Sequence, residues 1–239
     1  MKKILLMVLC LLLIGCNPPE VPKDPVQPEH SLYYNEKYSV EDVIKSFNEV
    51  VLKTEYSTGD GDASLVQRWD IPIYYTIGGY YKDEDIAVLK DLFKQLNAIP
   101  GFPGIYESDE EHPFNLNITF YKDKKSFDKV LGDFVNYESV DGAVRYWYWT
   151  DTNDIYEAVI GYVFNDTVNR KSVLLEEVIN GLGISDTTER EDSIVYQYSS
   201  TNEELSEMDI IVLSLLYNER IRCGMTKQEC ETIIRELYY

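Results

Sequence analysis

Histidine is the scarcest residue type in this 239-residue chain, which contains only His30 and His112. A catalytic zinc site generally takes three protein ligands, most of them histidines, so a three-imidazole site within one chain is excluded. The same scarcity leaves Ser/His and Cys/His nucleophilic catalysis without support. The chain also lacks a glycine-rich phosphate-binding loop and a Gly-x-Ser-x-Gly motif. The common hydrolase and nucleotide-binding sites are therefore not indicated.

Basic side chains are the second shortage. The chain has 22 Lys and Arg against 42 Asp and Glu, a formal net charge of −20. Loss of a leader that contains Lys2 and Lys3 would leave 20 basic side chains and a net charge of 20 − 42 = −22. So acidic a surface repels nucleic acid and anionic lipid headgroups. We therefore expect no nucleic-acid partner, good solubility and a monomer.

A long hydrophobic segment is missing as well, because the apolar run at residues 4–14 is too short to span a bilayer. The run ends at Leu13-Ile14-Gly15-Cys16, which resembles a bacterial lipobox. We predict that residues 1–15 are a signal peptide and that Cys16 is lipidated. The lipid would anchor the mature protein in the cell envelope, on a periplasmic or extracellular face. The alternative is an ordinary secretory peptide that leaves no anchor.

Cysteine is scarce too, with four residues in the whole chain. Cys10 falls within the predicted leader and Cys16 is assigned to the lipid, so Cys223 and Cys230 remain. An oxidising exterior would let these two pair across a short loop. Spacing alone does not decide whether their Cα atoms are close enough, so a Cys223–Cys230 disulfide and two separate thiols both stay open.

The mature chain divides into a tether and one domain. Residues 16–36 contain five prolines and few apolar side chains, which predicts an extended tether. Residues 37–239 suit a single domain with one core. This domain begins with a predicted amphipathic helix at residues 39–54 and ends in a C-terminal extension at residues 218–239.

Apolar periodicity predicts the elements between these ends. Strands are expected at residues 69–78, 114–121, 143–149 and 156–164, and residues 99–112 are expected to form a Gly/Pro-rich loop. Helices are expected at residues 83–96, 126–131, 174–182, 206–217 and 226–237. The order predicts an α+β domain with a mixed sheet of four or five strands packed on helices.

The most informative stretch is LLEEVINGLGISD, residues 174–186. Its apolar residues recur at helical spacing, and Gly183 is a natural stop for the helix. The stretch resembles the active-site helix of metzincin zinc proteases, H-E-x-x-H-x-x-G-x-x-H. Glu177 falls on the general-base position of that pattern. The three histidine positions are occupied by Glu176, Asn180 and Asp186.

Two further blocks carry the same resemblance in the same order. Ser193-Ile194-Val195-Tyr196 is similar to the turn beneath the zinc in matrixin-type metzincins. Leu205-Ser206 with Asp209-Ile210 is similar to the helix that closes their catalytic domains. The resemblance implies a single zincin-like domain. It is closest to uncharacterised secreted bacterial lipoproteins that carry Glu-Glu-x-x-Gln or a similar sequence in place of His-Glu-x-x-His, and it implies no particular activity.

The substituted positions change the chemistry that the resemblance would imply. Glu176 and Asn180 are four residues apart and share a helical face, and Asp186 could return to them after the Gly183 turn. Such oxygen ligands suit calcium, magnesium or manganese better than zinc, although a tight oxygen site usually takes about six ligands. We therefore expect no cofactor, with weak binding of those three ions as the alternative and zinc disfavoured. His112 is expected to be an exposed loop residue.

A second candidate site is RYWYW, residues 145–149. On a strand, Arg145, Trp147 and Trp149 face one way, and Tyr146 and Tyr148 face the other. The resemblance places this strand beside the substrate cleft, with Tyr196 in the turn below. It thus implies a groove that binds peptide by strand addition, or glycan by stacking on Trp147 and Trp149. Ordinary packing of these rings is the alternative.

The function predicted from these features is binding rather than catalysis. We expect an envelope-anchored lipoprotein whose degenerate metzincin-like domain binds a protein, peptide or glycan. The first alternative is a hydrolase that uses an oxygen-ligand metal site with Glu177 as general base. The second is a purely structural envelope component.

Overall fold

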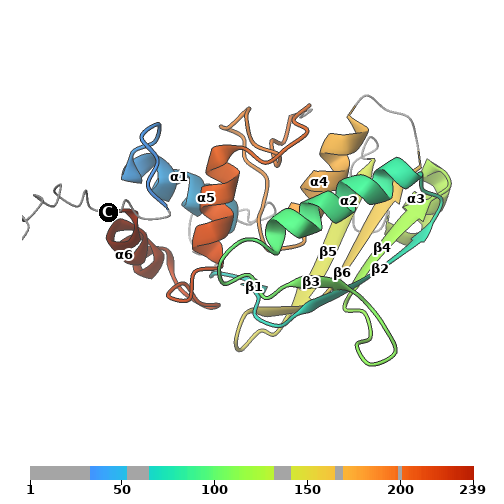
Figure 1. The fold of residues 1–239 in the computed structure, drawn as a ribbon, viewed down its shortest axis with the longest axis horizontal. Helices are drawn as coiled ribbons and strands as arrows, with labels where there is room; N and C mark the ends of the chain where they lie inside the picture. Colours follow the sequence, from blue (N-terminus) through green and yellow to red (C-terminus); the bar gives the residue numbers. More distant parts are fainter. Residues whose placement is uncertain (1–32, 53–64, 132–140, 165–168, 199–200) are drawn as a thin grey trace, which may run out of the picture. The chain divides into compact units, whose positions relative to one another are not determined.

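The structure is a computed structural model that describes residues 33–52, 65–131, 141–164, 169–198 and 201–239. These residues form six helices and six strands (Figure 1). The predicted signal peptide, Cys16 and most of the tether lie outside the described residues. Within the described ranges, none of the helices combines the length and the apolar character needed to cross a bilayer.

The strands form one mostly parallel sheet with the order β5–β6–β4–β2–β3. Its members are β2 (Ile73–Gly79), β3 (Ile105–Glu107), β4 (Leu116–Tyr121), β5 (Gly142–Tyr148) and β6 (Asp154–Val163). Of the strands in the described ranges, only β5 runs antiparallel to its neighbour, β6. A short strand, β1 (Arg68–Trp69), pairs parallel with the beginning of β6 on the side away from β5, because Ile155 is paired with both Trp69 and Tyr148. Among the described strands, β3 and β5 are therefore the two edges.

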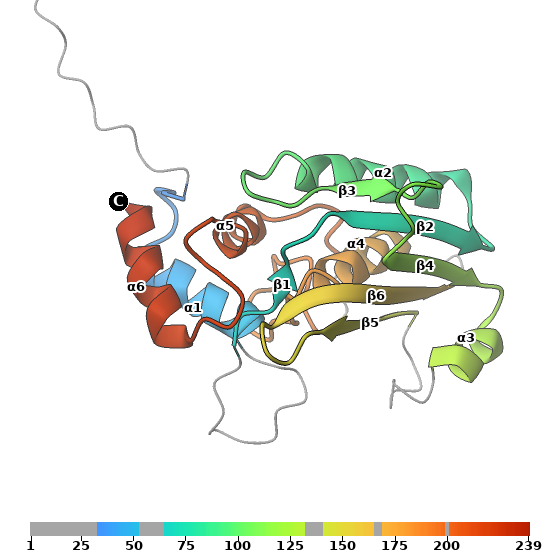
Figure 2. The same cartoon turned by 90° about the horizontal axis from the view of Figure 1, so that it is seen from below.

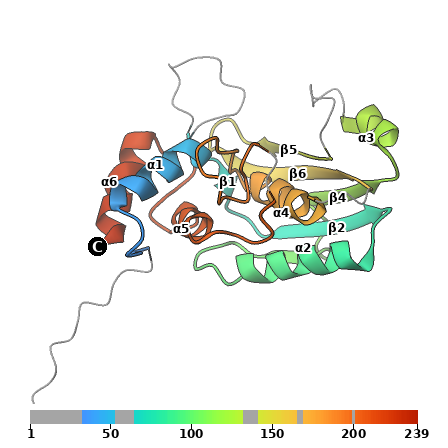
Figure 3. The same ribbon diagram turned by 90° about the horizontal axis from the view of Figure 1, so that it is seen from above.

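Two helices cover one face of this sheet, as Figures 1 and 3 show: α2 (Asp83–Leu96) and α4 (Arg170–Asn180). Alternation along β4 explains the layering, since Leu116, Ile118 and Phe120 are buried in the main core and the residues between them face the other way. On that other face, α3 (Lys124–Leu131) covers one end with Phe127 (Figure 2).

A second group of helices extends the same core beyond the sheet. It consists of α1 (Val40–Val51), α5 (Glu207–Leu216) and α6 (Lys227–Tyr238). Helix α1 contacts both α5 and α6, and Phe47, Leu213 and Ile234 are all fully buried in the main core. The predicted C-terminal extension is therefore part of the packed domain. Capping boxes begin α1 at Ser39 and α6 at Thr226, the first residues of the helices expected at 39–54 and 226–237.

Two predictions about strands were wrong. The stretch at residues 69–78 is not one strand, because the chain breaks between β1 and β2 near Pro72, which has no N–H for a ladder. The two pieces then pair with different strands, β6 and β4. The predicted loop at residues 99–112 contains β3, whose three residues are too few for a periodic signal. The fold class is nevertheless mixed α/β, consistent with α+β, and the described residues supply six strands to the sheet, where four or five were expected.

Candidate functional site

The helix of the metzincin-like pattern is anchored at its N-terminal end by Arg170. Its guanidinium donates to both carboxylate oxygens of Asp85 in α2, at 2.7 and 2.8 Å, and to the Val163 carbonyl of β6 at 2.9 Å. Burial alone would raise the pKa of Asp85, but the hydrogen bonds from Arg170 and from the Lys82 backbone outweigh it and hold the pKa below its ordinary value. Arg170 thus joins α4 to helix α2 through the ion pair and to the sheet through the Val163 carbonyl.

The C-terminal end of α4 is a tight turn. The helix ends at Asn180, earlier than the predicted stop at Gly183. Gly183 has φ +94°, and a Cβ there would lie 2.2 Å from the Gln67 carbonyl oxygen, so the position requires glycine. The Trp69 indole N–H donates to the Gly181 carbonyl at 2.8 Å, which ties this turn to β1. The chain is thereby turned back toward its own helix.

This turn brings together two of the three residues at the histidine positions. The Asn180 side-chain amide donates to Asp186 Oδ1 at 2.9 Å. Asn180 Oδ1 is buried and accepts no hydrogen bond from the described residues. Burial raises the pKa of Asp186, and the Asn180 hydrogen bond offsets only part of that rise. Glu176 is half-buried one helical turn before Asn180.

Glu177, at the general-base position, lies against the beginning of edge strand β5. Its residue is 9% exposed. A Cβ added to Gly142 would lie 2.8 Å from Glu177 Cγ and Oε1 and 2.7 Å from Val173 Cγ1. The carboxylate is thus packed beside backbone, and its charge adds to burial in raising the pKa of Tyr162. The close approach of α4 to β5 therefore depends on glycine at position 142, which has no side chain.

The second and third sequence blocks are joined by one carboxylate, Asp209 of α5. It accepts hydrogen bonds from the Ser193 hydroxyl at 2.7 Å and from the backbone N–H groups of Ile194 at 3.0 Å and Ser206 at 3.1 Å. Arg190 pairs with the same carboxylate and also donates to Ser193 Oγ at 2.9 Å. Ser206 in turn caps the helix by accepting from the Asp209 N–H. The turn and the closing helix therefore form one hydrogen-bonded unit.

The turn itself lies across the segment that follows α4. Thr187 donates its backbone N–H to the Val195 carbonyl at 2.8 Å, and Gln197 donates to the Thr187 carbonyl at 3.0 Å. Val195 is buried in the main core. Tyr196 is half-buried, and its ring makes an edge contact with Tyr198 at 5.6 Å. These bonds hold the turn against Thr187, the residue that directly follows Asp186.

The aromatic strand β5 has the predicted two faces for most of its length. The Arg145 guanidinium lies over the Trp147 ring at 5.1 Å, on one face. On the other face, Tyr146 and Tyr148 lie 6.5 Å apart, and the Tyr146 hydroxyl donates to Gln67 at 3.1 Å. Burial, with the charge of Tyr148, raises the pKa of Tyr146 to about 12, so this phenol stays neutral.

Trp149 differs from the prediction, because it lies beyond the end of the strand. A register shift separates Trp147 from Tyr148, and β5 ends at Tyr148. Trp149 is 55% exposed and stacks on Tyr156 at 4.4 Å. Within the described ranges, no ring contact joins Trp147, Trp149 and Tyr196 to one another.

The cysteine pair left open by the sequence is not joined: Cys223 and Cys230 are both free thiols. Cys230 is fully buried in the main core, whereas the Cys223 thiol donates to the Arg68 carbonyl at 3.5 Å. Because the two side chains point into different surroundings, the short loop between them does not close a disulfide. His112 is exposed, as predicted, and stacks on Tyr74 at 4.7 Å.

One cluster with metal-binding side chains was missed by sequence reasoning. Ligand atoms of Asp70, Asp154 and Cys223 lie within 4.8 Å of one another. Arg68 neutralises part of this cluster by donating to Asp70 at 2.8 Å. The three residues come from separate segments, so no spacing in the sequence could have indicated the cluster.

Comparison with known proteins identifies the family of the chain. The model of a family described as "Protein of unknown function (DUF2927)" matches residues 40–236. No curated protein matches the chain. The match spans most of the chain, from α1 into α6, and the chain therefore belongs to the DUF2927 family.

Proposed function

We propose that this member of the DUF2927 family is an exported, lipid-anchored protein that binds extended peptide segments along edge strand β5. In this proposal the domain has a metzincin-like frame without a catalytic zinc. The observation that carries the absence of a catalytic zinc from this proposal is the hydrogen bond between Asn180 and Asp186, at 2.9 Å. Two positions that would hold a metal in a metzincin are engaged with each other.

The arrangement around α4 supports the metzincin-like frame. The chain passes from a mixed sheet to α4, then to the Ser193–Tyr196 turn and finally to α5. Val178, Ile194 and Leu213, one from each part, are buried in the same core. Asp209 bonds the turn to the closing helix. This is the order of parts that the three sequence blocks imply.

The side chains at the ligand positions support a binding role over zinc catalysis. Zinc in catalytic sites is held mainly by nitrogen and sulfur, whereas Glu176, Asn180 and Asp186 supply oxygen and amide groups. Glu177 is packed against Gly142. A carboxylate without a metal to polarise a carbonyl and lower the pKa of water is a weak hydrolytic catalyst. The same helix can still position β5.

The geometry of β5 supports recognition by strand addition. Among the described residues, β5 pairs only with β6. The Val163 N–H donates to the Asp141 carbonyl at 2.8 Å, and this bond sets the alternation of the antiparallel ladder. With the observed register, the backbone N–H and C=O groups of Val144 and Tyr146 point away from β6. An extended peptide can bond to such groups.

The proposed peptide site can be tested by changing one outward backbone donor. Val144→Pro removes an N–H that does not serve the β5–β6 ladder, so the sheet should tolerate it. Val144→Ala is the matched control, because it shortens the side chain and keeps the N–H. Screening an immobilised library of extended peptides should yield ligands for wild type and Val144→Ala, and these ligands should bind Val144→Pro at least about tenfold more weakly. Equal binding to a correctly folded Val144→Pro would refute strand addition.

The lipid anchor has its own test. Metabolic labelling with a radioactive fatty acid in a bacterial host should mark the full-length chain, and Cys16→Ser should abolish the label. The wild-type chain should partition into the detergent phase of a phase-separating detergent, and the Cys16→Ser chain should not. Release of unlabelled wild-type protein would contradict the anchor and leave the peptide site to be judged by the Val144 variants.

A second candidate function is metal-assisted hydrolysis, which one observation favours. Asn180 Oδ1 is buried beside Asp186 and receives no hydrogen bond from the part of the chain that the structure describes, and a hard cation would satisfy such an oxygen. Calorimetry with calcium, manganese and zinc tests this idea. Binding tighter than about micromolar, together with peptide turnover that Glu177→Gln abolishes, would establish the hydrolase and reject a purely binding role.

A further inference from the structure

A groove runs along the edge of the sheet opposite β5, between α2 and strands β2 and β3. It consists of two adjoining cavities of about 410 and 430 Å³, which share Tyr75 and Lys90 in their walls. These volumes lie within the usual range for small-molecule sites. None of the residues of the peptide site proposed above lines either cavity.

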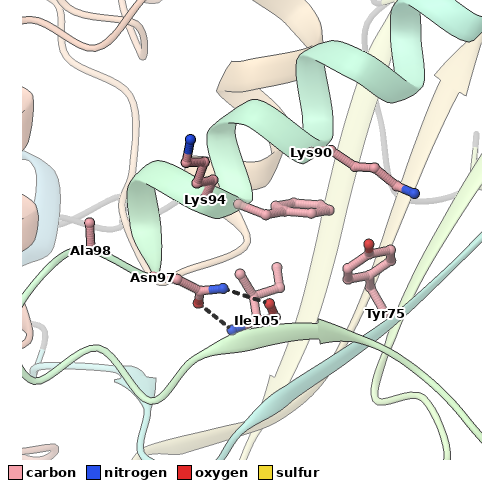
Figure 4. Close-up of a pocket in the computed structure, with 7 residues that line it drawn as sticks. Tyr75, Lys90, Lys94, Asn97, Ala98 and Ile105 are labelled. Atoms are coloured by element: carbon pink, nitrogen blue, oxygen red, sulfur yellow. Dashed lines mark hydrogen bonds between the residues drawn. The ribbon is translucent and has the colours of Figure 1, made fainter.

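The first cavity, shown in Figure 4, combines an apolar floor with positive charge. Phe93, Ala98 and Ile105 supply apolar surface, and the Phe93 ring contacts Tyr75 at 4.6 Å. The charged residues of its lining are Lys90 and Lys94, with no carboxylate among them. In a chain with 42 acidic and 22 basic side chains, the charge balance of this first cavity is complementary to an anion. The second cavity is different, because Asp83 and Glu107 belong to its lining.

The position of Lys90 suits a carboxylate ligand. In Figure 4 the Lys90 side chain extends on the side of the cavity where the Tyr75 hydroxyl lies. The Lys94 side chain, one helical turn later, points away from Ile105. Among the described residues, Lys90 forms an ion pair with Glu107, at 3.7 Å, and both side chains are more than half exposed. Such an exposed pair contributes little, so a ligand carboxylate can replace Glu107.

Asn97 decides between a small molecule and a peptide strand at this edge. Its side-chain oxygen accepts from the Ile105 N–H at 2.7 Å, and its amide donates to the Ile105 carbonyl at 2.9 Å (Figure 4). The amide thus occupies the outward backbone groups that an added strand would use. Strand addition at Ile105 is blocked, while the space between Phe93, Ala98 and Tyr75 remains open.

We propose that the first cavity of this groove is a second binding site, for a small amphipathic carboxylate. The apolar part of the ligand lies on Phe93, Ala98 and Ile105. Its carboxylate lies between the Lys90 ammonium and the Tyr75 hydroxyl, and Lys94 turns inward to contribute a second charge. The site is independent of the peptide site at β5.

Decanoate is a suitable probe, with decanol and decyltrimethylammonium as neutral and cationic analogues of the same chain length. Calorimetry should show binding of decanoate to the wild-type domain, with affinity for decanol at least about tenfold lower and no measurable affinity for the cation. Amide NMR shifts should change in α2 and β3. Equal affinity for decanoate and decanol, or no binding of decanoate, would overturn the proposal.

Substitutions separate this groove from unspecific binding of an amphiphile. Lys90→Met keeps the apolar stem and should weaken decanoate about tenfold, without changing the affinity for decanol. Lys129→Met, on the exposed side of α3, is the matched control and should have no effect. Ala98→Trp fills the first cavity without a change in charge and should abolish binding. Unchanged decanoate affinity in a folded Lys90→Met or Ala98→Trp variant would reject the groove as the site.

Discussion

Two carboxylates in the part of the chain that follows α4, the buried Asp209 and the half-buried Asp186, have very different surroundings. Asp209 accepts three hydrogen bonds from Ser193, Ile194 and Ser206 and is paired with Arg190. Asp186 has one hydrogen bond, from Asn180, and no cationic partner among the described residues. Among the described residues, only Asp209 has both a cationic partner and several hydrogen-bond donors.

This difference separates a region that stabilises the fold, the Ser193–Tyr196 turn with α5, from one that is free to change its chemistry, the Asn180–Asp186 pair. The turn and α5 are held by bonds within the chain, so they need no metal to keep their geometry. At the Asn180–Asp186 pair, burial and an unsatisfied oxygen remain as a cost to stability. Removing a partner of the Asp209 network should therefore lower the free energy of unfolding strongly, and changes to the Asn180–Asp186 pair should not.

The largest effect is expected for Asp209→Ala. It leaves Arg190 without its partner in a position where only 13% of that side chain is exposed, and breaking a buried ion pair generally costs about 3–5 kcal/mol. Urea unfolding followed by far-UV circular dichroism measures the loss. Asp192→Ala, at an exposed residue of the same turn, is the control and should change stability by less than about 0.5 kcal/mol. A loss below about 1 kcal/mol for Asp209→Ala would contradict the structural role of the network.

Asp85 extends the comparison to pH, because its carboxylate is paired with Arg170. Its folded pKa is below the ordinary value of 3.8, so its contribution to stability is present above that pH and is lost as the pH falls through the folded pKa. Asp85→Asn should cost about 3 kcal/mol at neutral pH. The difference from wild type should shrink steadily below pH 3.8. Urea titrations between acid and neutral pH test this, and a constant difference would refute it.

A smaller loss is expected where α4 approaches β5. Gly142→Ala would place a methyl group within 2.8 Å of Val173 and Glu177 atoms, and overpacking of this kind costs about 1–3 kcal/mol. Glu177→Ala removes one of the two obstacles, so the double variant should recover part of the loss. Thermal and urea unfolding of the single and double variants measure this coupling. Additive losses would show that Glu177 does not press on Gly142.

The smallest effect, with the opposite sign, is expected for Asp186→Asn. The folded pKa of Asp186 is raised above 3.8, so its stabilising form is the protonated one, present below that pH and lost as the pH rises through the folded pKa. An asparagine resembles that form and can donate to Asn180 Oδ1. At neutral pH the variant should be more stable by about 1 kcal/mol, and the gain should vanish in acid. Destabilisation that appears only when calcium or manganese is present would instead indicate a cation at this position.

Much of the fold was predictable because its signals are local. Ser39 and Thr226 cap their helices where the sequence places them, and α2 begins and ends at the predicted residues, Asp83 and Leu96. β3 was not predictable, because three residues in a loop become a strand only through pairing with β2. The division of residues 69–78 into two strands likewise depends on distant partners, because β1 pairs with β6 and β2 pairs with β4.

The candidate site shows the same division. The pattern around Glu177 located the helix, and the spacing from Asn180 to Asp186 correctly suggested that these residues meet. The spacing could not show that Asn180 and Asp186 bond to each other. It also could not show that Glu177 lies against Gly142, which is 35 residues away along the chain. Arg190 and the lysine-lined groove gave no sequence signal, since their partners come from separate segments.

The amino-acid sequence by itself determined the acidic charge, the scarcity of imidazoles, the capped helices and the alternation of the strands, because each depends on residue type and near neighbours. Only the tertiary structure decided which sheet edge is closed by Asn97, which carboxylate is satisfied and which cysteines stay apart. These outcomes depend on contacts between distant segments, and such contacts form only when the whole core packs.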